Sequence, residues 1–489
     1  MAARPGVRTE RGRARWRRRL IGLVAIAGIV ILPYGCQGTK PLPAGLSYAG
    51  ELRPVDDIEF LADLTFVDAE GVRRHEQQIF DEALRLISEA REFVVLDMFL
   101  YNPYLGAAPD PTRELSDELT DALVARKREL RGLDVIVITD PVNTVYGGLS
   151  SDQFERLREA GIEVVVTRLD ALRDSNPVYS LFWRVFVRPL GNGEGDLLPN
   201  PFGEGRVSLR SYLRLLNFKA NHRKTLLADS GDGLVALVTS ANPHDGSSAH
   251  TNVAIRFDGP AVLDLLETEN AVLELSGSEP YEPAAAARPA MARSEVTVQV
   301  LTEKKIEDAV IEAIETADSG DALGLAMFYL SDRDIIGALK SAEARGVETR
   351  VLLDPNKDAF GREKNGVPGR PVAHELHDHG LPVRWCDTHG EQCHMKLLLV
   401  DYASGVSTLI AGSANFTRRN LENFNLETNV AVRGPGDAEV FADARAFFDL
   451  MWRNEAGRHI STAYSSYADE SLFKRVLYRF MEGSGISTF

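Results

Sequence analysis

At 489 residues the chain is long enough for two domains with full hydrophobic cores, and 44% apolar with 26% charged residues is the composition of a folded globular protein. The formal net charge is −16, and residues 1–19 contribute +7 through eight Arg and one Glu, so the remainder carries −23. A body this acidic is a poor electrostatic partner for a phosphate polymer, so nucleic acid is not expected as a partner. Three cysteines are too few for a disulfide scaffold.

The N-terminus has the pattern of an export segment. The Arg-rich residues 1–19 precede an apolar run of 13 residues, LIGLVAIAGIVIL at 20–32, which is short for a membrane span and typical of a signal sequence. Because the Arg cluster should stay in the cytoplasm, we expect a membrane-anchored protein with an extracytoplasmic body, in the periplasm or at the cell exterior. Cys36 after Gly35 is a lipidation candidate, although Pro33 stands where such sites usually carry Leu. Cleavage, retention and lipidation all stay open.

The rest of the chain divides into two halves of similar pattern. Each half starts with a helix and an apolar strand, followed by a second strand that ends in Asp-Pro and by a short third strand. We expect the helices at 73–91 and 303–317, the Asp-Pro strands within 131–141 and 345–355, and the third strands at 161–166 and 380–385. Such alternation predicts α/β domains with a largely parallel or mixed sheet.

These patterns give the predicted domain organisation. Residues 1–50 form the export segment and a linker, followed by a first domain at 51–276, a Pro/Ala-rich linker at 277–292, a second domain at 293–455 and a tail at 456–489. The tail holds a helix around 470–482, to which we assign no function.

The first half carries an insertion after its third strand. It contains PVYSLFWRVFV, in which Tyr179, Phe182, Trp183 and Phe186 follow the spacing of one helix face. This stripe either packs on the domain or forms a lip that dips into a bilayer or holds acyl chains, and the sequence leaves both open.

The most specific pattern is His-x-Lys-x-x-x-x-Asp, which occurs twice. The first copy places His222, Lys224 and Asp229, and the second places His394, Lys396 and Asp401. Each copy is followed by an apolar run and a Ser-Ala-Asn turn, with Ser240 and Asn242 in the first half and Ser413 and Asn415 in the second. A Thr-Asn-Val segment then closes each copy. Two matches in the same local setting indicate an internal duplication.

These paired motifs resemble the phospholipase D superfamily, over roughly residues 75–455. The resemblance implies two tandem α/β/α domains related by a pseudo-twofold axis, with the active site at their interface. No oligomer is required, since both motifs lie in one chain. The superfamily includes phospholipases D, cardiolipin and phosphatidylserine synthases and some nucleases, so the fold and the reaction type follow more securely than the substrate.

The resemblance also implies a reaction, displacement at a phosphodiester through a phosphohistidine. One histidine attacks phosphorus, and the other protonates the leaving alcohol and then activates the incoming water or alcohol. Side chains alternate along a strand, so the His and Lys of each motif project from one face. Since the lysines supply the positive charge, we expect no metal and no cofactor. Lys224, Lys396, Asn242 and Asn415 would bind the non-bridging oxygens with help from Ser240 and Ser413, while Asp229 and Asp401 would hold the strand ends.

The two copies differ at one informative position. In the family an acidic residue after the Asn turn orients the histidine, and Glu427 occupies that position in the second copy, whereas the first copy has His250. We therefore expect Glu427 beside His394, where a carboxylate raises the imidazole pKa and suits a general acid. His222 is then the nucleophile, in agreement with the family's usual order. The residue that orients His222 stays open, with Asp245 and Asp258 as candidates.

The expected function is a membrane-anchored phospholipase D-type enzyme with a phospholipid substrate, either a phosphatidyltransferase resembling cardiolipin synthase or a hydrolase. The alternative is an exported nuclease or another phosphodiesterase of the same superfamily. The sequence leaves open transfer or hydrolysis, the head group or acceptor, and whether Cys386 and Cys393 pair.

Overall fold

The computed structural model describes residues 16, 19–21, 28 and 37–489, apart from 107–111, 191–195, 231–232, 284–293, 360–361 and 488. Most of the apolar run at 20–32, Cys36 and part of the predicted linker lie outside the described residues, so anchoring and lipidation stay predictions. Within the described ranges, no helix is both long enough and apolar enough to span a bilayer.

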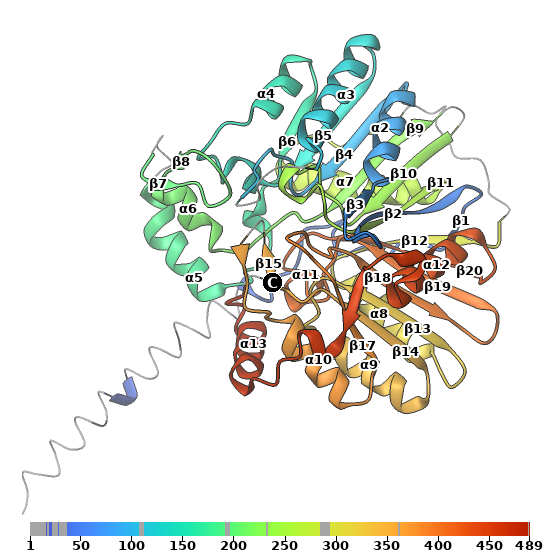
Figure 1. Cartoon of the computed structure of the whole chain (residues 1–489). Coiled ribbons are helices and arrows are strands. Elements are labelled where there is room, and N and C mark those ends of the chain that lie inside the picture. Colours follow the sequence, from blue (N-terminus) through green and yellow to red (C-terminus); the bar gives the residue numbers. More distant parts are fainter. Residues whose placement is uncertain are drawn as a thin grey trace, which may run out of the picture.

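The first domain is built on an eight-stranded mixed sheet, shown in the upper half of Figure 1. In sheet order its strands are β3 (Arg73–Glu76), β2 (Ile58–Val67), β11 (Asn252–Asp258), β10 (Gly233–Thr239), β9 (Lys224–Ser230), β4 (Phe93–Met98), β5 (Asp134–Thr139) and β6 (Glu163–Val166). β4, β5 and β6 are parallel, and β9 runs antiparallel to β4. Its main helices are α2 (Ile79–Glu89), α3 (Leu115–Glu129), α4 (Asp152–Glu159) and α7 (Ala261–Ser276).

The second domain repeats this plan with a nine-stranded sheet. In order its strands are β1 (Arg53–Pro54), β12 (Thr297–Thr302), β20 (Thr428–Pro435), β19 (Val406–Gly412), β18 (Lys396–Asp401), β13 (Ala322–Met327), β14 (Glu348–Leu353), β17 (Val383–Cys386) and β21 (Ser461–Ala463). Its helices are α8 (Lys304–Thr316), α9 (Arg333–Arg345), α10 (Gly369–Asp378), α11 (Arg418–Leu421), α12 (Glu439–Arg453) and α13 (Leu472–Ser484). The edge strands β1 and β21 extend this sheet beyond the predicted bounds of the second domain, 293–455.

Each sheet is covered by helices on both faces. Apolar side chains of α2, α3 and α4 pack on the outer face of the first sheet, and those of α8, α9 and α10 pack on the outer face of the second. The inner faces share one core with α7 and α12, in which the rings of Phe60 and Phe447 lie 5.6 Å apart. The predicted α/β/α architecture with two tandem domains is therefore confirmed. The pseudo-twofold axis itself stays a prediction.

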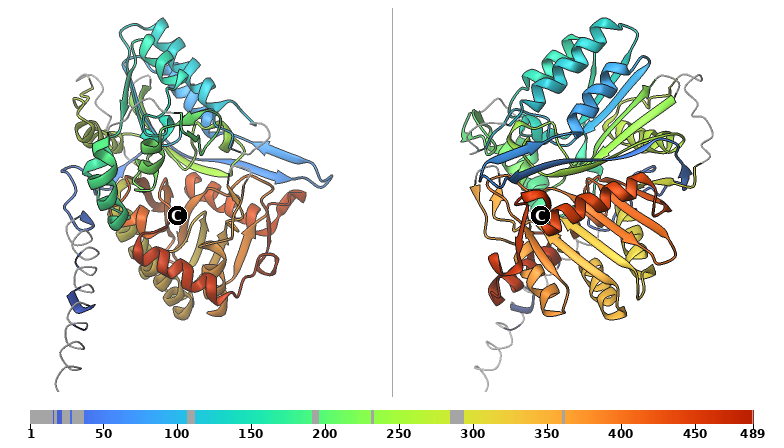
Figure 2. Two further views of the ribbon diagram at one scale, coloured as in Figure 1. Left: turned by 90° about the vertical axis from the view of Figure 1, so that its left-hand side faces the viewer. Right: turned by 45° about the vertical axis from the view of Figure 1, so that its right-hand side comes forward.

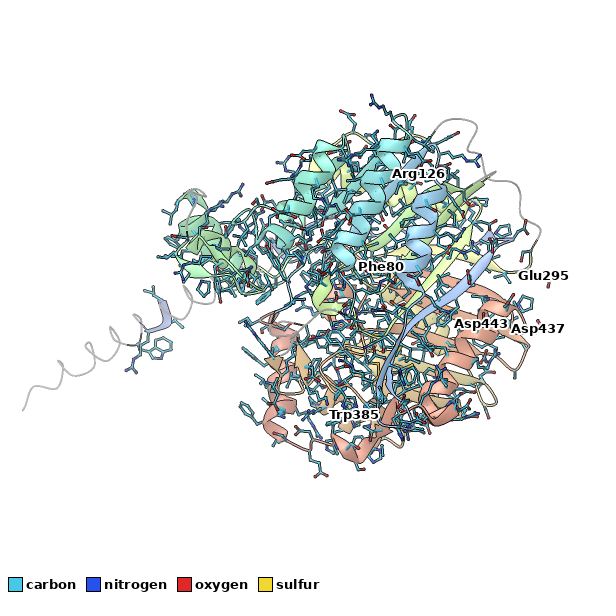
Figure 3. All side chains as sticks on the ribbon, turned by 45° about the horizontal axis from the view of Figure 1, so that its top comes forward. Phe80, Arg126, Glu295, Trp385, Asp437 and Asp443 are labelled. Carbon is cyan, nitrogen blue, oxygen red and sulfur yellow. A yellow bond between two sulfur atoms is a disulfide. The ribbon has the colours of Figure 1, made fainter. Side chains whose placement is uncertain are left out.

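Side chains fill both halves of the molecule in Figure 3, where Phe80 and Arg126 mark the first domain and Trp385 marks the second. One predicted helix boundary is wrong. The helix expected at 73–91 begins only at Ile79, because Arg73–Glu76 forms β3 and pairs with the edge of β2. The helix expected at 303–317 is α8, and the tail helix expected around 470–482 is α13.

The insertion of the first domain forms a helical layer at the left of Figure 1. It consists of α5 (Pro177–Phe182), a π-helical turn η3 (Trp183–Val187), η4 (Arg188–Leu190), the small hairpin β7 (Leu198–Pro199) with β8 (Arg206–Val207), and α6 (Leu209–Leu215). The aromatic stripe is partly packed on the domain and partly exposed on the surface. Trp183 is only 4% exposed, whereas Phe182 and Phe186 are 49% and 63% exposed.

The remaining elements are short. They are the two-stranded hairpin β15 (Asp358–Ala359) with β16 (Arg362–Glu363), and the single turns η1 (Pro141–Thr144), η2 (Leu169–Ala171), η5 (Asp245–Ser247), η6 (Glu455–Gly457) and η7 (Tyr464–Ser466). Of these, β15 and β16 lie beside the cavity described next.

Candidate active site

The two histidine motifs meet where the domains contact each other. The backbone N–H of His222 donates to Leu426 O at 2.8 Å, and the N–H of His394 donates to Thr251 O at 2.8 Å. Each motif thus pairs, just before its strand begins, with the segment that closes the other domain's copy. These reciprocal bonds bring the two motifs to the same place.

Both histidines line one cavity of about 450 Å³ at the domain interface. Asn242 and Asn415 also line it, so four of the predicted site residues face a common space. The wall is largely aromatic and aliphatic, and several basic side chains interrupt it. The apolar part includes Phe99, Tyr146, Phe202, Phe218, Phe328 and Phe489, and the basic part includes Lys219, Arg362, Lys364 and Arg419.

The two motif lysines lie fully buried behind the histidines. Lys224 Nζ donates to His222 O at 2.7 Å and lies 5.1 Å from the centre of the Phe99 ring. Lys396 Nζ donates to His394 O at 2.6 Å and lies 5.3 Å from the Phe328 ring. Each lysine therefore holds the backbone of its own histidine and retains further N–H donors for a ligand.

Burial leaves these cations poorly stabilised. It lowers the pKa of Lys224 to about 7, and it lowers the pKa of Lys396 well below its usual range with help from the charge of Lys224. A bound anion would reverse both effects, because it offers each ammonium a counterion in a medium of low dielectric constant. The pair is therefore suited to hold a phosphate group.

Glu427 lies beside the histidine of the opposite domain, so the expectation that it would lie beside His394 is wrong. His222 Nδ1 is 2.9 Å from Glu427 Oε2, and the carboxylate accepts its N–H. The reason is the cross-domain pairing, since Glu427 directly follows Leu426, the residue bonded to His222 N. This contact also answers what orients His222. Of the earlier candidates, Asp245 accepts from Ser116 N and Asp258 from Asp56 N and Asp57 N.

The Glu427 carboxylate is fully buried and held by side chains on both oxygens. Ser413 Oγ donates to Oε2 at 2.5 Å, and Asn420 Nδ2 donates to Oε1. Thr428 N in turn donates to Ser413 Oγ at 3.0 Å. The Ser413 hydroxyl thus gives its one proton to Glu427 and does not line the cavity, so we assign it a positioning role in place of the direct phosphate contact expected from the sequence.

His394 is oriented by neutral groups. Its Nδ1 lies 3.0 Å from the carbonyl oxygen of Ser240 and 3.2 Å from Asn252 Oδ1. Ser240 Oγ donates to the same Asn252 oxygen at 3.1 Å, so Asn252 takes the place that Glu427 has in the other half. Asn252 is not among the predicted site residues, although its position in the repeated Thr-Asn-Val segment marks it. His250, the counterpart of Glu427, places its ring 5.8 Å from that of His394.

Burial favours the neutral form of both imidazoles. It lowers the pKa of His222 to about 4, while the Glu427 carboxylate opposes the shift. It also lowers the pKa of His394 well below the usual range, and here the charge of Lys396 adds to the effect. With a hydrogen-bond acceptor at each Nδ1, both rings carry their proton there and leave Nε2 free.

Two buried aspartates fix the residues in front of the histidines. Asp140 Oδ2 accepts from Asn221 N at 2.7 Å, and Asp354 Oδ2 accepts from Cys393 N at 2.8 Å. Both belong to the Asp-Pro ends that the sequence comparison identified, but their role follows only from the fold. Burial raises the pKa of Asp140 to about 7 and that of Asp354 to about 6.

The motif aspartates hold strand ends, as expected. Asp229 accepts from the backbone N–H groups of Arg91, Glu92 and Phe93 at 2.8–3.0 Å. Asp401 accepts from Ser407 Oγ at 2.5 Å and pairs with Arg445 at 2.7 Å. Neither residue lines the cavity.

A disulfide joins Cys386 and Cys393, which settles a pairing that the sequence left open. It ties the end of β17 to the residue directly before His394. Over the described part of the chain, no group of three or more His, Cys, Asp or Glu side chains is arranged to hold a metal ion.

Comparison with known sequence families identifies the class of the second domain. Residues 310–452 match the family model described as "Cardiolipin synthase, PLD-like domain". The matched stretch contains His394, Lys396 and Glu427. The second domain is therefore similar to phospholipase D-like domains, and the predicted resemblance of the chain to the phospholipase D superfamily is confirmed.

Several solved structures are similar to this chain over different shares of its length. A phosphatidylserine synthase from Haemophilus influenzae Rd KW20 is similar over 89% of this chain and 96% of its own, with 10% identity and a TM-score of 0.54, which shows a shared fold. A polyphosphate kinase from Porphyromonas gingivalis matches 83% of this chain and 51% of its own at 15% identity and a TM-score of 0.44. The phospholipase D family member Nuc from Salmonella typhimurium matches 34% and 98% at 22% identity and a TM-score of 0.26. Among curated proteins, none matches the sequence.

Proposed function

We propose that the protein is a phospholipase D-type enzyme that cleaves or exchanges a phosphodiester of membrane phospholipids through a phosphohistidine. The observation that carries the proposal is the shared cavity, which His222 and His394 line from different domains, each with its motif lysine buried behind it, while a buried carboxylate orients one of the two histidines. A single phosphate in this cavity would meet both lysines and both free Nε2 atoms at once. That set matches the needs of displacement at phosphorus.

His222 acts as the nucleophile in this scheme. The reason is now the Glu427 carboxylate beside His222 itself, and no longer a carboxylate beside His394. When its Nε2 bonds to phosphorus, positive charge develops on the ring, and the Glu427 carboxylate at Nδ1 stabilises that charge. The stabilisation is largest in the transition state, where it accelerates the reaction.

His394 acts as the general acid and base. Burial and the two lysines lower the pKa of His394, whereas the bound substrate anion raises it, so the ring takes up a proton from solvent at Nε2 when the substrate binds. The neutral partners at Nδ1 make this protonated ring a stronger acid than a carboxylate partner would. In the first step the bond from His222 to phosphorus forms, the bond from phosphorus to the alcohol breaks, and His394 gives that alcohol its proton. In the second step water or an alcohol attacks phosphorus while His394 takes its proton, and the phosphorus–nitrogen bond breaks.

The cavity wall supports a lipid as the substrate. Aromatic and aliphatic side chains cover most of it, and the cations gather near the histidines and at Arg362, Lys364 and Arg419. A diacyl phosphodiester combines an anion with apolar chains in this way, whereas a nucleic acid would seek a continuous basic track. The alternative function, an exported nuclease or another phosphodiesterase, is disfavoured by the net charge of −16 on the chain.

The proposed location is the outer side of a membrane, with the N-terminal segment as the anchor. Its support is the Arg-rich start followed by the apolar run at 20–32, and the disulfide, since disulfides persist in oxidising compartments.

Product analysis tests the reaction. Purified protein is incubated with phosphatidylglycerol, with and without added alcohol, and the lipid products are separated and identified by mass spectrometry. Phosphatidic acid alone indicates hydrolysis, and a new phosphatidyl alcohol or cardiolipin indicates transfer. No lipid product, combined with cleavage of single-stranded DNA, would replace the proposal with the nuclease alternative.

A further inference from the structure

Helix α13 presents an apolar face to solvent. Leu472, Phe473, Val476 and Phe480 lie at i, i+1, i+4 and i+8, within one face of the helix, and they are 69%, 74%, 61% and 60% exposed. The opposite face is polar and buried, because Tyr478 bonds to Glu375 and Glu482 accepts from Arg418 N. A helix with its apolar side outward needs a partner that a solvated monomer does not supply.

The insertion helix has a second such face. Val178, Phe182, Val185 and Phe186 are 40–63% exposed at i, i+4, i+7 and i+8, and the rings of Phe182 and Phe186 lie 5.4 Å apart. Trp183 turns the other way into the domain. The outward residues therefore form a ridge rather than part of a core.

The helices that carry these two apolar faces, α5 and α13, lie on one side of the molecule (Figures 1 and 2). The end of α13 abuts the start of α5, since a Cβ at Gly485, which follows α13, would overlap Ser175 O. Gln37 is the first residue of the continuously described chain. It also lies beside the start of α5, because Asp174 N donates a hydrogen bond to Gln37 O at 3.1 Å. We call the outward residues of α5, η3 and α13 the apolar ridge.

The start of the chain indicates what covers this ridge. The apolar run ends at residue 32, only five residues before Gln37. Five extended residues span at most about 17 Å, so a membrane that holds the run lies within that distance of Gln37, which contacts the base of α5.

The charge beside the ridge points to the same partner. Arg210 and Arg214 lie 5.7 and 5.9 Å from the ring of Trp183, which is buried behind the ridge, and within the described ranges no carboxylate lies within 4.0 Å of either one. Arg188 adds a third cation, with Asp170 at 4.0 Å. On a chain of net charge −16, such a cluster next to exposed Phe and Leu side chains matches an anionic lipid surface.

The ridge is also attached to the cavity. Lys219 lines the cavity and pairs with Asp174 at 2.8 Å, at the base of α5. Arg419 lines it too and donates to Ser487 Oγ at 2.9 Å, just after α13. A surface that positions these two helices would thereby position the cavity wall.

We propose that the apolar ridge of α5, η3 and α13 docks on an anionic phospholipid bilayer and thereby presents the cavity to its lipids. Phe473, Phe480, Phe182 and Phe186 enter the acyl boundary, and Arg188, whose side chain is 52% exposed, meets lipid phosphates. Arg210 and Arg214 add positive charge behind the ridge. The inference rests on the proposed phospholipid reaction for its purpose, but the docking itself can be measured without catalysis.

The binding test uses full-length F473W and F182W proteins on phosphatidylglycerol vesicles whose acyl chains carry bromine, which quenches nearby tryptophan. The matched control is V72W, because Val72 is 45% exposed in the β2–β3 turn. The β2–β3 hairpin projects away from α5 and α13 (Figure 2). The wild-type protein, with four tryptophans, sets the background. We expect added quenching for F473W and F182W and none for V72W. No added quenching at residue 473 or 182 would overturn the proposal.

The activity test separates this inference from the proposed function. F473S/F480S and F182S/F186S should lose about tenfold or more in activity on phosphatidylglycerol vesicles and keep wild-type activity on a short soluble phosphodiester, with V72S as the control. Equal losses on both substrates would overturn docking. If the wild type cleaves neither substrate while the tryptophan variants are still quenched, the proposed function fails and docking stands. If the serine variants instead dissociate an oligomer, the ridge is a contact between copies, and the proposal is overturned.

Discussion

Replacing Glu427 by Gln should impair His222 specifically, because both oxygens of the carboxylate accept hydrogen bonds from side-chain donors. Asn420 Nδ2 donates to one oxygen, and His222 Nδ1 and Ser413 Oγ donate to the other. A glutamine has one oxygen and one NH₂ group, so one of these contacts must face a second donor. If the NH₂ meets His222, the ring moves its proton to Nε2, and the nucleophilic lone pair is lost.

The expected cost is about 10³–10⁴ in the rate of phosphohistidine formation, the range seen when a buried carboxylate behind a catalytic imidazole becomes an amide. The charge also matters, since Glu427 raises the pKa of His222 against burial. Its removal lowers that pKa further, so the acidic limb of the activity profile, below which the nucleophile is protonated, moves to lower pH.

The assay is the rapid-quench burst with an activated phosphodiester whose alcohol leaves without protonation. E427Q should slow the burst itself, and S413A, which keeps the charge, should slow it by about tenfold, the equivalent of one hydrogen bond. A burst of normal rate, followed by slower turnover of ordinary lipid only, would show that Glu427 assists His394 after all and would refute the cross-domain argument.

Two further changes test the site and its support. H222N should form no covalent intermediate, whereas H394N should still form one with the activated substrate and lose about 10²–10⁴ in rate on ordinary lipid; phosphate found by peptide mass spectrometry on His394 instead would reverse the assignment. R223M should destabilise the fold by about 3–5 kcal/mol, because it leaves Glu303 and Glu269, now 2.9 and 3.5 Å from the buried guanidinium, without their counterion. A melting temperature equal to that of the wild type would show that these carboxyl groups are neutral in the folded protein.

The sequence predicted most of what depends on local pattern. The two copies of one motif predicted His222 and His394 at the start of buried strands. The repeated Asp-Pro ends and Ser-Ala-Asn turns predicted that the chain consists of two similar halves. Residues 73–76 fall within the helix expected at 73–91, and it is pairing with β2 that makes them a strand. Local pattern does not report such pairing.

The partner of Glu427 could not be found in this way. Residues 222 and 427 are 205 positions apart, and the distance between them is set by how two domains pack. A repeat comparison aligns Glu427 with its own motif, so it pointed to His394. The role of Asn252 could not be found from the sequence either. Asn252 and Asn429 occupy matching positions in the two Thr-Asn-Val segments, and only the fold shows that Asn252 accepts hydrogen bonds from His394 and Ser240.

The exchange of orienting residues between the halves bears on what a duplicated chain can do. If two identical subunits formed this site, every substitution would appear twice, and both histidines would have the same partner. Because the halves are one chain, Glu427 and His250 can differ at matching positions, as can Arg223 and Met395. Each half supplies the environment of the other half's histidine, so a mutation in one domain adjusts the chemistry of a residue in its neighbour, and the two histidines can diverge into different roles.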